Sequence, residues 1–130
     1  MKISGKFDVT LKPMETYAEG VEGSNLGRMS IDKTFHGDLS AESKGEMLNV
    51  MTPVKGSAGY VAIEQVSGSL FDKRGTFVLQ HFGTMSGGND NLILEVVPDS
   101  GTGELTGLTG KMEIRVENSQ HFYDFEYTSA

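Results

Sequence analysis

The stretch that decides the fold is GYVAIEQVSGSLFDKRGTFVLQHFG, residues Gly59–Gly83. On both sides of its DKRG segment, Asp72–Gly75, apolar residues occupy every second position, which is the period of a β-strand. The DKRG segment itself has the charged residues and the glycine of a tight hairpin connection. The sequence therefore predicts two antiparallel strands, at Ala58–Phe71 and Thr76–Met85.

The same alternation extends over most of the chain. Further strands are predicted at Lys2–Leu11, Arg28–Asp38, Leu39–Thr52, Leu92–Val97, Glu104–Leu108, Lys111–Glu117 and His121–Thr128. Nearly all of them are joined by short connections, so sequential antiparallel neighbours are the simplest topology. We expect one all-β domain over residues 1–130, a single closed antiparallel β-barrel of about eight strands.

One predicted connection is much longer than the others. Residues Pro13–Gly27 lose the alternation and are rich in Glu and Gly. A loop of this length is either a lid or rim at a barrel mouth or a mobile surface loop. The sequence leaves both roles open.

The composition excludes several kinds of site. The chain has no cysteine, which rules out disulfides, thiolate metal ligands and a cysteine nucleophile. Its 11 Lys and Arg against 18 Asp and Glu give a net charge of −7 without any basic stripe, so no nucleic-acid partner is expected. No secretory leader and no apolar run long enough to span a membrane is visible. We therefore expect a cytoplasmic protein with no membrane partner.

A few polar side chains fall on strand faces that are otherwise apolar. Glu64 alternates with Tyr60 and Val66, and His81 alternates with Leu79. Burial disfavours a charged carboxyl and raises its pKa, which would suit Glu64 to acid or base chemistry near neutral pH. The candidate catalytic residues are Glu64 and His81 as an acid/base pair, with Tyr127 or Tyr60 donating to a substrate oxygen.

Other side chains on the same faces are candidates for contacts with a ligand. The candidate ligand-binding residues are Tyr60, Phe77, Leu79, His121, Tyr123 and Phe125. Each polar candidate also has a purely structural interpretation. Glu64 can lie at a strand end or pair with Arg74 or Arg115, the histidines can be satisfied core residues, and buried tyrosines commonly pack and bond through the hydroxyl.

No metal or cofactor is expected. The three histidines, His36, His81 and His121, lie 45 and 40 positions apart and form no H-x-H pair. The GTG at Gly101–Gly103 is not followed by a helical pattern, so it is not a dinucleotide fingerprint.

Two predicted strands are apolar on both faces. In one strand, Val61 and Ile63 lie on the face opposite Tyr60 and Ala62. In the other, Ile93 and Val97 lie on the face opposite Leu92, Leu94 and Val96. The outer face of a monomeric barrel has no cover, so outward apolar residues predict a subunit interface or a packed terminal segment. We expect a homo-oligomer of undetermined size.

The segment SGTGELTGLTGKMEI, Ser100–Ile114, resembles a bacterial family of unknown function with an allene-oxide-cyclase-like barrel. Phe35–Leu48, Gly59–Gly83 and His121–Thr128 resemble the same family, which more distantly resembles allene oxide cyclases and dirigent proteins. The resemblance implies a barrel around an elongated apolar cavity. No catalytic residue can be transferred from it.

Three functions remain open. The first is binding of a small apolar or amphipathic molecule in the barrel lumen, without established catalysis. The second is an enzyme similar to an isomerase or cyclase, acting on such a ligand through Glu64 and His81. The third is an oligomeric interaction module with a filled lumen. The sequence does not identify the ligand or the reaction.

Overall fold

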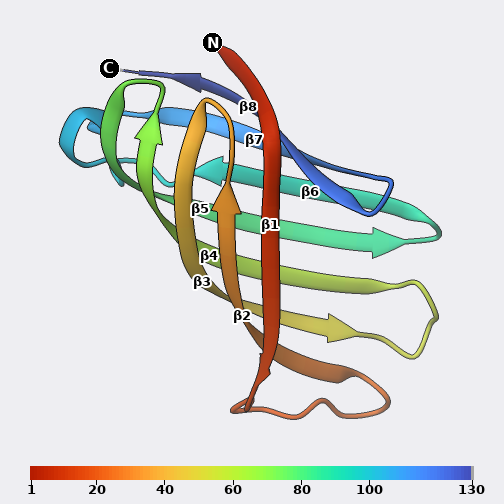
Figure 1. The fold of residues 1–130 in the computed structure, drawn as a ribbon. Helices are drawn as coiled ribbons and strands as arrows, with labels where there is room; N and C mark the ends of the chain where they lie inside the picture. Colours follow the sequence, from red (N-terminus) through yellow and green to blue (C-terminus); the bar gives the residue numbers. More distant parts are fainter. Residues whose placement is uncertain (130) are drawn as a thin grey trace.

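The computed structural model describes residues 1–129 as one closed antiparallel barrel. Each strand pairs with the next in sequence, and the first strand closes the barrel against the last (Figure 1). The eight strands are β1 (Lys2–Met14), β2 (Asn25–Phe35), β3 (Leu39–Met51), β4 (Ala58–Leu70), β5 (Lys73–Ser86), β6 (Asn89–Val96), β7 (Thr109–Glu117) and β8 (Gln120–Thr128). The predicted fold class is confirmed. Among these residues, no helix has the length and apolar character needed to cross a membrane.

The strands are longer at several ends than the sequence predicts. β1 continues to Met14 and β2 begins at Asn25, which shortens the long connection to residues 15–24. The predicted strand Glu104–Leu108 is wrong: a short 3₁₀ turn, η1 (Gly103–Leu105), occupies this segment. Gly103 and Gly107 have φ values of 59° and 84°, a left-handed conformation that breaks a strand. The two leucines of the segment, Leu105 and Leu108, are buried in the barrel end.

Aromatic and aliphatic side chains fill the middle of the barrel. The Phe77 and Phe125 rings stack with centroids 6.0 Å apart, and Leu79 and Tyr123 are fully buried in the same cluster. All four are residues for which the sequence predicts contacts with a ligand. Here all four belong to one buried hydrophobic cluster, so the centre of the barrel is packed core.

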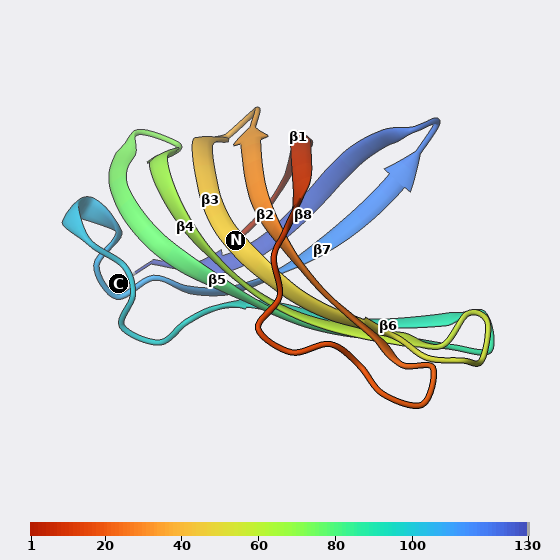
Figure 2. The same ribbon diagram turned by 90° about the horizontal axis from the view of Figure 1, so that it is seen from below.

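Strands β3, β4 and β5 pair along their whole length, whereas the wall between β6 and β7 is nearly unpaired. Among residues 1–129, Glu95 and Lys111 are the one pair of facing residues that joins β6 to β7. Figure 2 shows strongly curved strands, with the tip of the β7–β8 hairpin pointing away from β6. The molecule therefore has one broad, regular sheet surface and one open seam.

Candidate functional site

A chain of polar side chains crosses the inner face of four neighbouring strands. Lys33 lies on β2, Ser43 on β3, Glu64 on β4 and His81 on β5. The Cα positions of Lys33 and Ser43 are paired across β2 and β3, and those of Ala62 and His81 across β4 and β5. All four polar side chains are buried. The barrel register thus brings these four polar side chains together in one layer.

Glu64 is at the centre of this layer and is 0% exposed. The Lys33 ammonium donates to Glu64 Oε2 at 2.9 Å, and the Ser43 hydroxyl donates to Oε1 at 2.7 Å. His81 Nε2 also contacts Glu64 Oε2. Both carboxylate oxygens therefore have partners, as a buried charge requires.

The environment of Glu64 keeps it ionised. Burial is the largest single influence and raises the pKa, but the hydrogen bonds and charges of His81 and Lys33 outweigh it and lower the pKa to about 2. The sequence-based expectation of a raised pKa is therefore wrong, because it considered burial without the buried cation. Glu64 acts as a fixed negative charge across the physiological range.

The ionised carboxylate also determines how His81 is protonated. A carboxylate only accepts, so His81 Nε2 carries the hydrogen of that contact. In the neutral ring Nδ1 is then an acceptor, and the Tyr60 hydroxyl, 3.0 Å away, donates to it. Burial first and the Glu64 charge second raise the pKa of Tyr60, so the phenol keeps its proton. The polar chain Lys33–Glu64–His81–Tyr60 ends at a half-buried phenol.

Sequence reasoning missed Lys33 and Ser43. The signal was present for Lys33, which alternates with Ile31 and Phe35 and therefore lies on the apolar face of its strand. The cation beside Glu64 is this lysine. Arg74 instead bonds Ser69 on the surface, and Arg115 forms ion pairs with Asp124 and Glu117 there.

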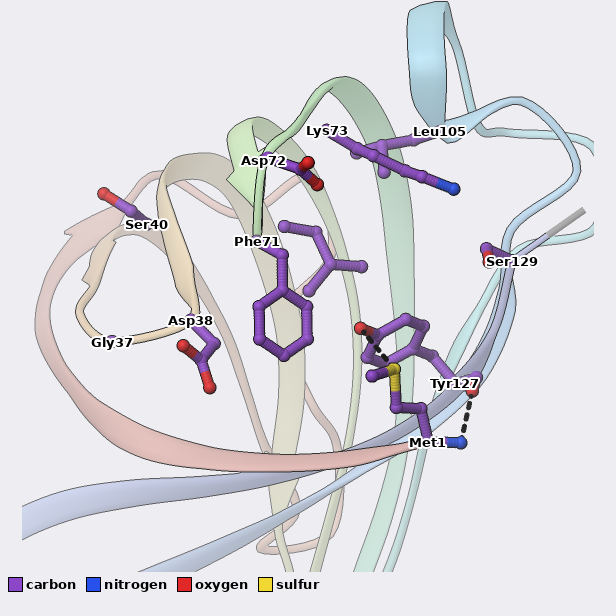
Figure 3. A pocket seen from close by; sticks show the side chains of 11 residues that line it. Met1, Gly37, Asp38, Ser40, Phe71, Asp72, Lys73, Leu105, Tyr127 and Ser129 are labelled. Carbon is purple, nitrogen blue, oxygen red and sulfur yellow. Dashed lines mark hydrogen bonds between the residues drawn. The ribbon is translucent and has the colours of Figure 1, made fainter.

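A pocket of about 720 Å³ lies at one end of the barrel, beside the β2–β3 and β4–β5 turns (Figure 3). Its walls are mostly apolar, and the charged residues that line it are Asp38, Asp72, Lys73 and Met1 with its N-terminal ammonium. The lining residues are Met1, Gly37, Asp38, Ser40, Leu70, Phe71, Asp72, Lys73, Leu105, Tyr127 and Ser129. We call this the barrel-end pocket.

Tyr127 belongs to the barrel-end pocket and not to the layer of Glu64 and His81. Its hydroxyl donates to Met1 Sδ at 3.3 Å, and burial, together with the charge of Asp38, raises its pKa. Leu70, a lining residue, is six positions along β4 from Glu64, which is roughly 20 Å in a strand. The structure therefore does not bring the three candidate catalytic residues together.

Phe71 in the wall of this pocket has an unusual backbone. Its φ is 56°, in the left-handed region that bulky residues rarely adopt. Its amide donates to the Asp38 carbonyl at 2.7 Å, which ties the β4–β5 turn to the neighbouring β2–β3 turn. The strained turn holds the 44%-exposed ring against the pocket (Figure 3).

The remaining candidates have structural partners. The Tyr123 hydroxyl donates to the His36 carbonyl at 2.8 Å and accepts from the Leu39 amide at 3.3 Å, so it fastens the β2–β3 turn. His121 packs against the Phe7 ring at 5.3 Å. Within residues 1–129, no cluster of three His, Asp or Glu side chains could hold a metal ion.

The family model described as "Protein of unknown function (DUF3224)" matches residues 3–127. A crystal structure from Shewanella oneidensis MR-1, of a protein with unknown function from the same family, is 62% identical in sequence. Its TM-score is 0.98, and the alignment covers 100% of this chain and 97% of that one. No curated protein matches the chain. These comparisons confirm the predicted family, whereas the more distant relation to allene oxide cyclases stays a prediction.

Proposed function

The chain belongs to the DUF3224 family of proteins of unknown function, and we propose that it binds a small apolar or amphipathic molecule in the barrel-end pocket. The observation that carries this proposal is the pocket itself. Its volume of about 720 Å³ is in the range of small-molecule sites, which are typically mostly apolar with a few polar groups that fix orientation.

The arrangement of the walls suggests how such a molecule lies. Phe71 and Tyr127 offer aromatic surface, and Leu105 adds an aliphatic wall. Asp38 and Asp72 bring carboxylates to the same pocket (Figure 3). An apolar body packs against the rings, and a polar or cationic head group is placed near the carboxylates.

The Phe71 backbone supports the same proposal. A phenylalanine in the left-handed region costs stability, and such strain is often retained where a side chain has a function. Glycine or asparagine would make the turn at lower cost. The strain therefore favours a role for the ring beyond making the turn.

The alternative of acid–base catalysis by Glu64 has less physical support. Glu64 is fully buried, both of its oxygens are hydrogen-bonded, and its low pKa keeps it ionised. Such a carboxylate holds no proton to give near neutral pH. In this arrangement Glu64 stabilises the barrel and orients His81.

The test combines ligand capture with a pocket variant. Native mass spectrometry of the gently purified protein should detect a bound small molecule, and a neutral fluorescent probe such as N-phenyl-1-naphthylamine should bind the emptied protein. Phe71→Ala should weaken probe binding about tenfold, or about 1.4 kcal/mol. Tyr17→Ala is the matched control, because Tyr17 is an aromatic side chain fully exposed to solvent. Equal probe affinity for both variants and the wild type would contradict the proposal.

A further inference from the structure

The Tyr60 hydroxyl is hydrogen-bonded to a base. It lies 3.0 Å from His81 Nδ1, within the distance over which a proton passes between two groups. The other ring nitrogen, Nε2, holds its hydrogen against the Glu64 carboxylate, so Nδ1 presents a lone pair to the phenol proton. A neutral imidazole takes up a proton near neutral pH. Phenol, imidazole and carboxylate thus form one line along which a proton can move.

The other three tyrosines have no base on the hydroxyl in the part of the chain that the structure describes. Tyr123 donates to the His36 carbonyl oxygen at 2.8 Å, and Tyr127 donates to the Met1 thioether at 3.3 Å. Both acceptors take a hydrogen bond, but neither is basic enough to take the proton. Tyr17 is fully exposed to solvent. These three tyrosines are therefore internal references for Tyr60.

This difference matters when a tyrosine loses an electron. A phenol that has lost one electron becomes a strong acid, so its oxidation is easy only if the proton can leave at the same time. The pKa of the resting Tyr60 phenol is raised, first by burial and then by the charge of Glu64, so the proton stays in place until the electron departs. His81 Nδ1 is then the group that receives the proton.

The composition of the chain directs one-electron oxidation to tyrosine. Tryptophan and cysteine are the side chains that compete most strongly with tyrosine for this reaction, and the chain contains neither. Its seven methionines react with peroxides by taking up an oxygen atom, which is a two-electron process. Tyr60 is half-buried and not enclosed, so an oxidant in solution can approach it.

From this arrangement we infer that Tyr60 is a redox-active tyrosine, a site of reversible one-electron oxidation that uses His81 as its proton acceptor. The electron passes to a one-electron oxidant such as an organic peroxyl radical, which becomes the peroxyl anion and takes a proton from water. The O–H bond of Tyr60 breaks, its proton moves to His81 Nδ1, and a neutral phenoxyl radical remains beside an imidazolium. A one-electron reductant such as ascorbate returns the electron, and the proton returns from Nδ1. Neither Tyr60 nor His81 lines the barrel-end pocket, so the inference is independent of the proposed function.

The buried charges around His81 suit a proton that is taken up and released. Once protonated, His81 is a cation in contact with the Glu64 carboxylate, and this contact stabilises it. The Lys33 ammonium bonds the same carboxylate oxygen at 2.9 Å and repels the new cation. Because the attraction is partly offset, the proton returns to Tyr60 when the phenoxyl radical is reduced.

The sheet holds the Tyr60 ring in place for this transfer. Tyr60 is paired with Gly83 on β5, and His81 is the neighbouring inward residue on that strand. A Cβ atom at position 83 would lie 2.4 Å from the Tyr60 ring, so a side chain there would displace the ring. The Tyr60 and His81 rings meet edge to face, with centroids 5.8 Å apart. The strand register and this glycine therefore fix the hydrogen bond.

Two variants that each keep one accessible tyrosine test the inference. Tyr17→Phe keeps the half-buried Tyr60, because Tyr123 and Tyr127 are buried, whereas Tyr60→Phe keeps the fully exposed Tyr17. The oxidant is flash-generated tris(bipyridine)ruthenium(III), and the absorption of the phenoxyl radical measures the oxidation rate at neutral pH.

Exposure and proton transfer predict opposite results in this comparison. Tyr17 is the more exposed ring, and the acidic loop around it attracts the cationic oxidant, so accessibility alone predicts faster oxidation of Tyr17. With His81 as proton acceptor, we expect Tyr60 to be oxidised at least about tenfold faster than Tyr17. A rate for Tyr60 that does not exceed that of Tyr17 overturns the inference.

Replacement of the base separates proton transfer from hydrogen bonding. In the Tyr17→Phe background, His81→Gln supplies an amide oxygen that accepts a hydrogen bond from Tyr60 but does not take its proton. We expect the oxidation rate of Tyr60 to fall at least about tenfold, and circular dichroism shows whether the variant is folded. An unchanged rate in folded His81→Gln overturns the inference. If this variant does not fold, the comparison of Tyr17→Phe with Tyr60→Phe decides alone.

Electron paramagnetic resonance gives a spectroscopic signature that a purely structural hydrogen bond would not produce. In oxidised Tyr17→Phe, the g-tensor of the radical should report a hydrogen bond from protonated His81 to the phenoxyl oxygen. Addition of ascorbate should remove the radical and leave a protein of unchanged mass. A radical that instead ends as covalent dityrosine contradicts reversible oxidation at Tyr60.

Discussion

The layer around Glu64 and the barrel-end pocket use similar side chains in opposite ways. Around Glu64, the Lys33 ammonium, the Ser43 hydroxyl and the His81 imidazole all bond the carboxylate, and the Tyr60 phenol bonds the imidazole. In the barrel-end pocket, Asp38 and Asp72 form no ion pair with any of residues 1–129. A charge whose bonding capacity is already used stabilises the fold, whereas one left beside an apolar wall is available to a ligand. The four predictions below test this contrast, from the largest expected effect to the smallest.

Removing the charge of Glu64 should have the largest effect on stability. Glu64→Gln leaves the Lys33 ammonium buried without a counter-charge, which should lower the free energy of unfolding by about 3–5 kcal/mol. Urea denaturation measures this change. The control is Glu46→Gln, which breaks the surface ion pair with Arg28 and should cost less than about 1 kcal/mol. Equal losses for the two variants would refute the buried layer as a source of stability.

The stability of the wild type should fall at acidic pH because of the same residue. The folded-state pKa of Glu64 is lowered from 4.5 to about 2, so its contribution is complete above pH 4.5 and is lost as the pH falls toward 2. A shift of this size corresponds to about 3 kcal/mol. Denaturation curves between pH 6 and 2 should show this loss in wild type and in Glu46→Gln. Glu64→Gln should lack this component; an unchanged pH dependence in that variant would show that another group is responsible.

Removing the phenol at the end of the polar chain should have a smaller effect. Tyr60→Phe deletes the donor to His81 Nδ1 and should lower the free energy of unfolding by about 1 kcal/mol. Thermal denaturation monitored by circular dichroism is sufficient to detect it. Tyr17→Phe, at a fully exposed position, should have no effect. A loss of several kcal/mol in Tyr60→Phe would mean that the Tyr60 hydroxyl is as essential as the charges.

The pocket should tolerate a change that the core does not. Phe71→Gly removes a partly exposed ring but relieves a left-handed φ of 56°, so the free energy of unfolding should change by less than about 1 kcal/mol. Probe binding to the barrel-end pocket should nevertheless fall. Phe77→Ala in the packed centre should cost about 3–5 kcal/mol. A large loss of stability in Phe71→Gly would assign Phe71 to the core instead of to a binding wall.

Alternation was sufficient to predict the barrel and the faces of its strands. It placed Glu64, His81, Phe77 and Tyr123 on the inner face, and all four are buried there. The period of two residues is a local property, and it survives in each strand whatever its neighbours are.

Alternation did not predict the level of each residue along the barrel. Tyr127 and His81 share the inner face, but the stagger between strands places Tyr127 at the pocket and His81 in the Glu64 layer. That stagger depends on pairing between distant segments, which no single strand encodes. The pairing of Lys33 with Glu64, 31 positions apart, was missed for the same reason.

A strand was wrongly predicted at Glu104–Leu108 because glycine can have two structural roles in a β protein. Glycines permit strands to bend, but they also permit the left-handed turn that is observed. Leu105 and Leu108 have the spacing of a single turn that buries both side chains. The apolar pattern alone could not separate these structures.

The seam between β6 and β7 has a consequence for unwanted assembly. Because β6 and β7 have one paired position, most of their facing backbone N–H and C=O groups are unpaired. In this respect the two strands resemble the edge strands of an open sheet. The strands on both sides of this gap carry exposed charges, Asp90 and Glu95 on β6 and Lys111 and Glu113 on β7. A foreign strand that pairs with either edge would have to strip water from these groups, so we expect these charges to disfavour edge-to-edge assembly at the seam.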